Sequence, residues 1–184
     1  MPDLRDPYSA IGAIEAINSN KAESTHLALK NLSKVNEYVF SKILIAIDGS
    51  EESLHAADYA IEIARRYNAE VIALNVILSG ATLHGPSVSP HIIELKQEAQ
   101  NYLDKAKEKA ERRMSNDNDN KIRLRTELIG APSTVGGVVA FAEKNNVDLI
   151  IIGTRGRSGF TKLLLGSVAS GVVTYAHCPV MVVK

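Results

Sequence analysis

Short apolar segments alternate with longer amphipathic segments from Lys42 to the end of the chain. The apolar segments predict β-strands, because they are a few residues long and are bounded by turn-forming residues. The predicted strands are Lys42–Asp48, Val71–Ile77, Ile122–Ile129, Val147–Gly153 and Pro179–Val183. Between them, apolar residues recur at helical spacing, so that five strands alternate with four helices. This alternation predicts an α/β fold with an open parallel sheet that helices cover on both faces.

The polarity of each predicted strand indicates its place in the sheet. Lys42–Asp48 and Val147–Gly153 are largely apolar on both faces, as central strands of such sheets are. Ile122–Ile129 alternates apolar and polar residues and is expected at an edge. These places fit the strand order 3-2-1-4-5, with the topological switch point between strands one and four. Ligands bind at the carboxyl ends of the strands beside such a point, so we expect a site at Ile47–Ser50 and from Gly153 onward.

Composition and charge narrow the class of protein. The 184 residues suffice for one domain and an extension, and 45% of them are hydrophobic, so a core can form. The chain has 21 Lys and Arg residues and 21 Asp and Glu residues. It therefore has no net charge that would attract it to nucleic acid or to a membrane surface. The single cysteine rules out an internal disulfide and fits a reducing compartment. Without a signal peptide or a membrane span in the sequence, we expect a cytoplasmic protein.

The first 40 residues do not follow the strand–helix alternation. Leu4, Tyr8, Ile11 and Ile14 have helical spacing, and a second such group follows after a polar break. We expect an N-terminal extension over residues 1–40, formed by two short helices or by an arm that becomes ordered on a partner. Residues 41–184 then form the ligand-binding domain.

The most informative pattern is GTRGRSGFTKLLLGSVAS, which begins at Gly153. Gly156 follows after two residues, and Gly166 with Ser167 follows after nine more. Glycine has no Cβ, so backbone N–H groups beside it can approach a ligand closely. Ser167 opens a predicted helix, whose free N–H groups and dipole favour an anion. The spacing therefore predicts a phosphate site, although scattered glycines after a strand also serve as simple turn formers.

Two arginines and one aspartate add to this interpretation. Arg155 and Arg157 flank the middle glycine of the pattern, and a guanidinium group is a good partner for phosphate oxygens. Asp48 ends the first strand at the switch point, where it would face a ligand. The alternative for Asp48 is a purely structural role as the cap of the first helix.

The spacing G-x2-G-x9-G-[ST] at a strand-to-helix junction resembles the ATP-binding signature of the universal stress protein family. The resemblance extends over most of Lys42–Lys184 and includes Asp48, the GAP at Gly130–Pro132 and the ending AHCPVMVV. It implies a Rossmann-like fold of the adenine nucleotide alpha hydrolase-like type. It also implies a bound adenine nucleotide, ATP with AMP or ADP as alternatives, together with Mg²⁺.

The resemblance also implies roles for particular residues. In that family the first-strand aspartate and its neighbours line the ribose and the base, a residue at the end of strand two meets the base through its backbone, and the glycine loop and helix start hold the phosphates. The implied binding residues are Ile47, Asp48, Val76, Gly153, Thr154, Arg155, Gly156, Arg157, Gly166, Ser167 and Val168. Ala169 departs from those members that carry a hydroxyl group there, and Gly171 interrupts a predicted helix without an evident reason.

Other reactive side chains have structural interpretations. Arg123 and Arg125 are expected on the solvated face of the edge strand, and Cys178 is expected to be a small buried residue without a base beside it. His84 and His91 have no cysteine nearby, so the identity of any protein-bound metal stays unknown.

Three functions remain after the sequence is read. The first is a nucleotide-dependent regulator in a stress response, without an identifiable general base and with at most slow ATP hydrolysis. The second is an ATP-dependent enzyme that activates a substrate, but the chain reads DGSEES where the pyrophosphatase-loop enzymes carry SGGxDS, and it has no Walker A motif. The third is an adaptor or structural dimer of the same fold that binds no nucleotide.

The last strand predicts a homodimer. Val180–Val183 lies at an edge in the order 3-2-1-4-5 and carries no charge before Lys184, and uncharged apolar edges favour pairing with another chain. Pairing there is also what the family resemblance implies. The alternative is that the N-terminal arm covers this edge within one chain. The protein partner that would respond to the nucleotide state is unknown from the sequence.

Overall fold

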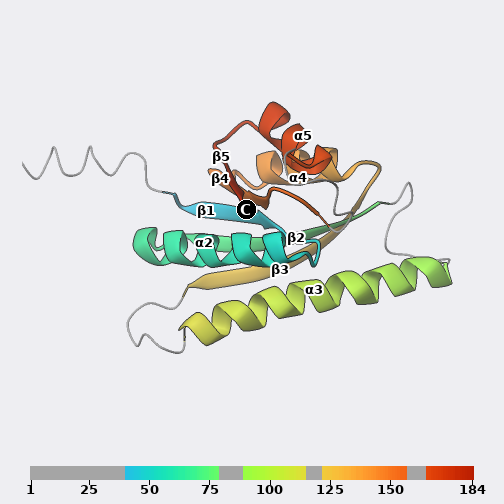
Figure 1. Ribbon diagram of the computed structural model, residues 1–184, viewed down its shortest axis with the longest axis horizontal. Coiled ribbons are helices and arrows are strands. Elements are labelled where there is room, and N and C mark those ends of the chain that lie inside the picture. Colours follow the sequence, from blue (N-terminus) through green and yellow to red (C-terminus); the bar gives the residue numbers. More distant parts are fainter. Residues whose placement is uncertain (1–39, 79–88, 115–121, 157–164) are drawn as a thin grey trace, which may run out of the picture. The chain divides into compact units, whose positions relative to one another are not determined.

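The computed structural model describes residues 40–78, 89–114, 122–156 and 165–184. Residues 1–39 of the predicted N-terminal extension, Arg157 and His84 lie outside these residues. The strands are β1 (Lys42–Ala46), β2 (Glu70–Leu78), β3 (Arg123–Ala131), β4 (Leu149–Gly153) and β5 (Val180–Val183), and the helices are α2 (Glu51–Tyr67), α3 (Pro90–Met114), α4 (Thr134–Lys144) and α5 (Ser167–Tyr175). All strand pairs are parallel, in the order β3-β2-β1-β4-β5, which confirms the predicted fold (Figure 1).

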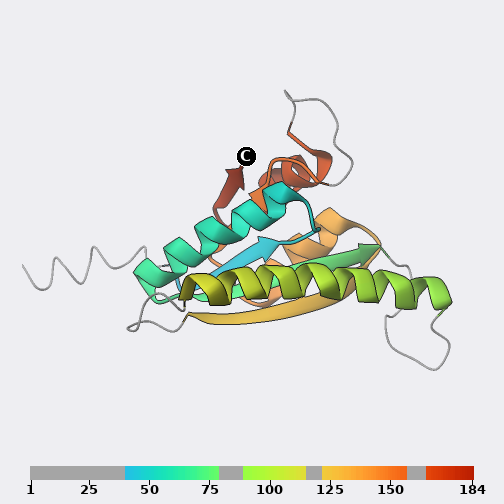
Figure 2. The same ribbon diagram turned by 60° about the horizontal axis from the view of Figure 1, so that its bottom comes forward.

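Two helices cover each face of the sheet. Helices α2 and α3 lie on one face, and α4 and α5 lie on the other, as Figure 1 and Figure 2 show together. Successive residues of β1 alternate between the two cores: Ile43 and Ile45 pack toward α2, and Leu44 packs toward α4 and α5. All three are at most 1% exposed, so β1 is the central strand that its apolar sequence predicts.

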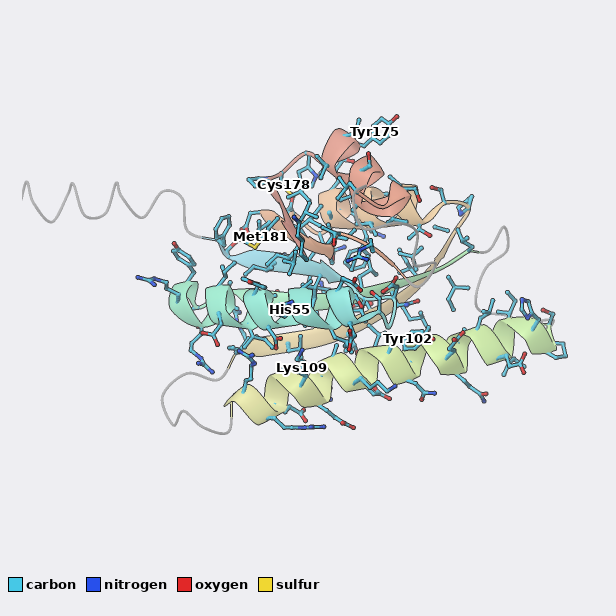
Figure 3. The ribbon with its side chains drawn as sticks, in the orientation of Figure 1. His55, Tyr102, Lys109, Tyr175, Cys178 and Met181 are labelled. Atoms are coloured by element: carbon cyan, nitrogen blue, oxygen red, sulfur yellow. The ribbon has the colours of Figure 1, made fainter. Side chains whose placement is uncertain are left out.

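Ion pairs fix α3 against α2. Lys109 extends from α3 toward α2 (Figure 3), where its Nζ lies 2.8 Å from Asp58 Oδ2 and donates to the Leu54 carbonyl oxygen at 2.9 Å. Arg113 Nε lies 3.1 Å from Asp58 Oδ1. The Asp58 side chain is only 13% exposed, so this cluster is better shielded from water than a surface ion pair. The position of α3, which forms a wall of the site described below, depends on these contacts.

The polar face of β3 differs from the expectation of simple solvation. Arg125 is 35% exposed, and its guanidinium group contacts Glu70 Oε1 at 2.8 Å and also pairs with Glu127. It also lies over the ring of Phe141, 6.0 Å from the ring centroid. Arg125 is therefore less solvated than predicted, because neighbouring acids on β2 and β3 and an aromatic ring from α4 contact it, whereas Arg123 is exposed as predicted.

Gly171, which the sequence did not explain, is required where α4 and α5 meet. A Cβ at this position would lie 2.7 and 2.9 Å from the two γ-carbons of Val135. Real Cβ atoms are not found so close to other carbons, so glycine allows these helices their close approach.

No helix in the described part of the chain is long and apolar enough to cross a membrane.

We expect Gly171→Ala to destabilise the protein. Overpacking a core contact costs about 1–3 kcal/mol, which exceeds the gain of about 1 kcal/mol that alanine brings through helix propensity. Urea unfolding of Gly171→Ala, Val135→Ala and the double variant tests the contact. In the Val135→Ala background, Gly171→Ala should become neutral or stabilising. An equal loss of stability in both backgrounds would show that Val135 is not the obstacle.

Candidate functional site

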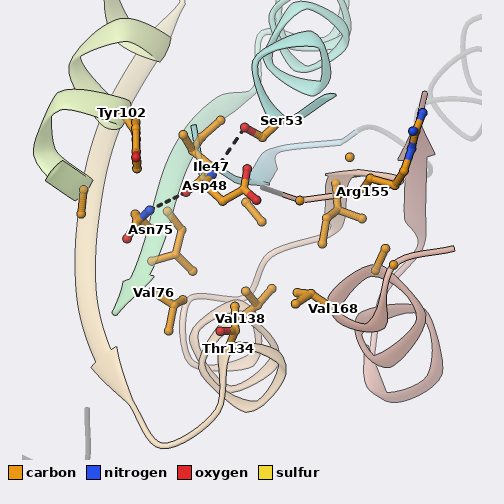
Figure 4. Close-up of a pocket in the computed structure, with 18 of the residues that line it drawn as sticks. Ile47, Asp48, Ser53, Asn75, Val76, Tyr102, Thr134, Val138, Arg155 and Val168 are labelled. Carbon is orange, nitrogen blue, oxygen red and sulfur yellow. Dashed lines mark hydrogen bonds between the residues drawn. The ribbon is translucent and has the colours of Figure 1, made fainter. Parts of the chain in front are cut away.

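A cavity of about 530 Å³ lies at the carboxyl ends of β1, β2 and β4 (Figure 4). It therefore lies at the topological switch point, where the sequence places the site. The predicted binding residues that line it are Ile47, Asp48, Val76, Gly153, Thr154, Arg155, Gly156, Gly166, Ser167 and Val168. Arg157, the remaining predicted member, lies outside the described residues. Side chains from α3 and α4 also line the cavity and were not predicted.

The cavity exists because β1 ends before its neighbour β2. The two strands pair as far as Ala46 and Leu74, whereas β2 continues beside β3 to Leu78. Ile47 N–H donates to the Leu74 carbonyl oxygen at 2.8 Å, so the backbone of Leu74 faces β1. Alternate residues of a strand direct their backbone groups to the same side. The N–H and C=O of Val76 therefore face the space beyond the end of β1.

Asn75 closes the end of β1 with its side chain. Its Nδ2 donates to the Ile47 carbonyl oxygen at 2.7 Å, and the residue is only 8% exposed. Asparagine is unfavourable in strands, so a polar residue within the apolar stretch VIALNVI needs a local reason. That signal was present in the sequence, but the partner of the amide depends on how β1 and β2 pair.

The turn after β1 is held by Asp48 and Ser50. Asp48 Oδ1 accepts hydrogen bonds from Ser50 N–H at 3.0 Å and from Ser50 Oγ at 2.6 Å. Ser50 is the N-cap of α2, and its Oγ accepts from Ser53 N–H at 3.2 Å. Asp48 therefore does not cap the helix itself but orients the residue that does. Between them, Gly49 has φ +86, a left-handed conformation that favours glycine.

The glycines of the G-x2-G-x9-G spacing are enclosed by the protein itself. A Cβ on Gly153 would lie 2.9 Å from the Glu52 carbonyl carbon at the start of α2. A Cβ on Gly156 would lie 2.5 Å from Asp48 Oδ2, and one on Gly166 would lie 3.0 Å from the Thr154 carbonyl oxygen. The sequence interpretation assigned these glycines to ligand approach. The structure adds a second reason, since each one lets two segments of the cavity wall approach each other.

Hydrogen-bond donors converge where α5 begins. Gly166 is the N-cap of α5 and makes no side-chain capping bond, so the first N–H groups of the helix, from Ser167 onward, have no intrahelical acceptor. The hydroxyl oxygen of Thr154 is buried beside the cavity and has no hydrogen-bond partner among the residues that the structure describes. Thr154 N–H donates to the Val183 carbonyl oxygen at 2.7 Å, which holds the segment in place. Such donors suit an anion.

Arg155 is engaged on the outside of this region. Its Nη2 lies 3.4 Å from Glu52 Oε1, and Figure 4 shows the side chain extending away from Asp48 and Val168. In this conformation, the donors at the start of α5 in the described part of the chain are backbone N–H groups and hydroxyl groups, without a cation. The placement of Arg155 at the cavity agrees with the sequence, but its guanidinium is directed to a protein carboxylate.

Helix α3 contributes a wall that the glycine pattern does not predict. Leu95, Glu98, Ala99 and Tyr102 line the cavity and follow the spacing of one helical face. From the other face of the sheet, α4 contributes Thr134 and Val138. The periodicity of α3 was visible in the sequence, but periodicity does not tell which part of an apolar face covers the core and which part lines a cavity.

The surroundings of the described histidine and cysteine side chains decide whether they could serve as metal ligands or nucleophiles. Among the described residues, no group of three or more His, Cys, Asp and Glu side chains could hold a metal ion. Burial, with a contribution from the charge of Asp148, raises the pKa of the Cys178 thiol. Cys178 packs beside the core between the sheet and helices α4 and α5, but it is half-buried and so less buried than predicted.

The fold and the cavity define an α/β protein with a cavity at its switch point. The sequence profile of the universal stress protein family matches residues 40–184, and the chain belongs to this family. A universal stress protein of Methanocaldococcus jannaschii is 40% identical over 160 residues, which cover 85% of this chain and 89% of that protein.

Solved structures show the same fold. Universal stress protein UspA from Lactobacillus plantarum matches with a TM-score of 0.64 at 26% identity, covering 79% of this chain and 98% of that one. A universal stress protein from Archaeoglobus fulgidus in complex with dAMP matches with a TM-score of 0.58 at 22% identity, covering 79% and 99%. A universal stress protein in complex with cAMP matches with a TM-score of 0.59 at 23% identity, covering 79% and 98%. These last two proteins of the same fold thus bind adenine nucleotides.

We expect Asn75→Ala to destabilise the protein by about 1–3 kcal/mol, because it leaves the buried carbonyl of Ile47 without a partner. Urea unfolding measures the loss. Asn101→Ala, at an exposed position of α3, is the matched control and should change stability by less than about 0.5 kcal/mol. Equal effects of the two substitutions would contradict the role of Asn75 at the end of β1.

Proposed function

We propose that this universal stress protein binds ATP with Mg²⁺ in the cavity at the switch point and acts as a nucleotide-dependent regulator in a stress response. The observation that carries this proposal is the pairing of two features in one cavity of about 530 Å³. Backbone groups of β2 without a strand partner lie at one end, and the uncapped start of α5 lies at the other. A nucleotide has complementary features, since its base carries donors and acceptors and its phosphates are anionic.

The β2 end of the cavity suits an adenine base. The N–H and C=O of Val76, which face no strand among the described residues, offer one donor and one acceptor side by side. Adenine presents an amino donor next to a ring-nitrogen acceptor, which matches this pair. Val138 and Leu74 provide apolar surface beside it. The family resemblance assigns the base to the same residue, so geometry and resemblance support one placement.

The α5 end suits the phosphates. First-turn N–H groups and the helix dipole favour negative charge, and the buried Thr154 hydroxyl could donate there as well. Mg²⁺ in nucleotide sites is usually held by one or two carboxylates together with the phosphates. Asp48 lines the cavity and lies against the glycine loop at Gly156, so we assign the Mg²⁺ to it in addition to the ribose contact that the family resemblance implies. The dAMP and cAMP complexes of other family members support the class of ligand.

Regulation fits the site better than fast catalysis. Asp48 and Glu98 are the carboxylates among the described residues that line the cavity, and each already accepts a hydrogen bond from a neighbouring side chain. No described histidine lines it. A general base must lie within reach of the nucleophile with a suitable pKa, and nothing in the described cavity fills that role at the α5 end. We therefore assign at most slow ATP hydrolysis.

We expect Thr154→Val to separate ligand binding from folding. Valine has the same shape and removes a buried hydroxyl that has no described partner, so the free protein should keep or gain stability. ATP affinity in isothermal titration calorimetry with Mg²⁺ should fall about ten-fold if the hydroxyl donates to a phosphate.

The matched control for this variant is Thr174→Val on α5, whose hydroxyl donates to the Ser170 carbonyl oxygen at 2.8 Å, outside the cavity. It should leave ATP affinity unchanged. Wild-type protein that neither releases an adenine nucleotide on heating nor binds ATP would overturn the proposed function and favour the adaptor alternative. An unchanged affinity in Thr154→Val would instead remove Thr154 from the phosphate site.

We also propose a homodimer through β5. Among the described strands, β5 pairs with β4 alone, so its other edge has no strand partner. Val180–Val183 carries no charge, and Met181 is 36% exposed on this strand (Figure 3). A two-fold pair of antiparallel last strands would cover the edge.

Met181→Lys should therefore shift the protein toward the monomer in sedimentation equilibrium, because it places a charge in the proposed interface. Val173→Lys, on an exposed part of α5, is the control and should leave the dimer intact. A dimer that is unaffected by Met181→Lys would place the interface elsewhere.

A further inference from the structure

The wall that α3 presents to the cavity is firmly positioned. The ring of Tyr102 covers the turn after β1, and a Cβ on Gly49 would overlap the ring carbons. Since Gly49 also has φ +86, glycine is required there both by conformation and by contact. The pairing of Lys109 with Asp58 holds the same helix further along. Figure 4 shows Tyr102 on the opposite side of the cavity from Val168.

Tyr102 in turn orients a carboxylate at this wall. Its hydroxyl donates to Glu98 Oε1, one helical turn away, and both residues line the cavity. An ionised carboxylate accepts hydrogen bonds and donates none, so it favours hydroxyl groups and disfavours phosphates. Holding Glu98 with a hydrogen bond from its own helix reduces the freedom that it would otherwise lose on binding a ligand.

The charges along the cavity are arranged unequally. Of the described lining residues, Glu98 and Asp48 are anionic, and Arg155 alone is cationic, with its guanidinium directed to Glu52. The start of α5, with its positive dipole end, lies away from the α3 wall. A ligand that carries phosphates on one end only is therefore favoured in one orientation, with its phosphates at α5 and its sugar hydroxyls toward α3.

From this arrangement we infer that Glu98, positioned by Tyr102, determines ligand specificity at the sugar. It accepts a hydrogen bond from a free ribose hydroxyl and excludes nucleotides that carry a phosphate on the 3′ oxygen. The ligand class is thus an adenosine 5′-phosphate with a free 3′ hydroxyl group. This class includes dAMP and excludes cAMP, so this chain would differ from the family member that is solved in complex with cAMP. This inference rests on the proposed nucleotide-binding function and adds a residue outside the glycine pattern to its site.

The test compares pairs of nucleotides that differ only at the 3′ position. Isothermal titration calorimetry of the full chain would use AMP against adenosine 3′,5′-bisphosphate, and ATP against 3′-deoxy-ATP. Wild-type protein should bind the 3′-phosphorylated nucleotide at least about ten-fold more weakly than AMP, and 3′-deoxy-ATP about ten-fold more weakly than ATP.

Three variants assign the discrimination to its source. Glu98→Gln should bring both affinity ratios within about three-fold of one, because the amide removes the charge and weakens the acceptor. Tyr102→Phe keeps the ring against Gly49 but removes the hydrogen bond that orients Glu98. It should therefore bring the two affinity ratios closer to one, but by less than Glu98→Gln does. Glu94→Gln changes the same charge one turn earlier, at an exposed position outside the cavity lining, and should leave the ratios at their wild-type values.

The outcomes separate this inference from the function on which it rests. Wild-type protein that binds neither ATP nor AMP would overturn the proposed function. Protein that binds ATP normally but keeps its 3′ discrimination in Glu98→Gln would overturn the inference alone. Equal effects of Glu98→Gln and Glu94→Gln would do the same, because they would reduce the result to general electrostatics. Thermal unfolding of each ligand-free variant checks that a changed ratio comes from the site and not from loss of the fold.

Discussion

The early end of β1 is the constraint on which the rest of the site depends. Because β1 stops pairing with β2 at Ala46 while β2 continues beside β3 to Leu78, the backbone groups of β2 that face β1 have no strand partner there. Buried backbone groups need partners. Asn75 satisfies the carbonyl of Ile47, just beyond β1, with its side chain, and we propose that the groups of Val76 serve a ligand. A longer β1 would satisfy the same groups within the sheet and remove this end of the cavity.

The crossovers at this point set the other walls. After β1 the chain passes to α2 on one face, and after β4 it passes to α5 on the opposite face, so the two connections diverge. Glycines let the diverging segments return to close contact: Gly153 against α2, and Gly156 against Asp48. The glycine spacing that marks the family is therefore partly a packing motif. Substituting these glycines would disturb the cavity walls as well as any ligand contact.

The two proposals of a nucleotide site and of a dimer meet at one residue. Thr154 has a buried hydroxyl beside the cavity, and its N–H donates to the Val183 carbonyl oxygen at the end of β5. The strand whose free edge we propose as the dimer interface thus also holds the segment that we propose to bind phosphate. Such a shared contact suits a protein whose output is a change of state, because a regulator needs its ligand site connected to a surface that a partner can recognise.

The sequence by itself determined the strand order and the location of the cavity. These follow from local periodicity and from the apolar character of β1 and β4, which neighbouring residues along the chain decide. Only the tertiary structure decided that the side chain of Asn75 bonds the carbonyl of Ile47 and that Arg155 pairs with Glu52. It also decided that Gly171 packs against Val135 and that α3 places Glu98 at the cavity. Each of these depends on a contact between residues far apart in the chain. Such contacts arise from how strands pair and how helices pack. Hydrophobic periodicity predicts which face of an element is buried, but it does not predict which residues that face contacts.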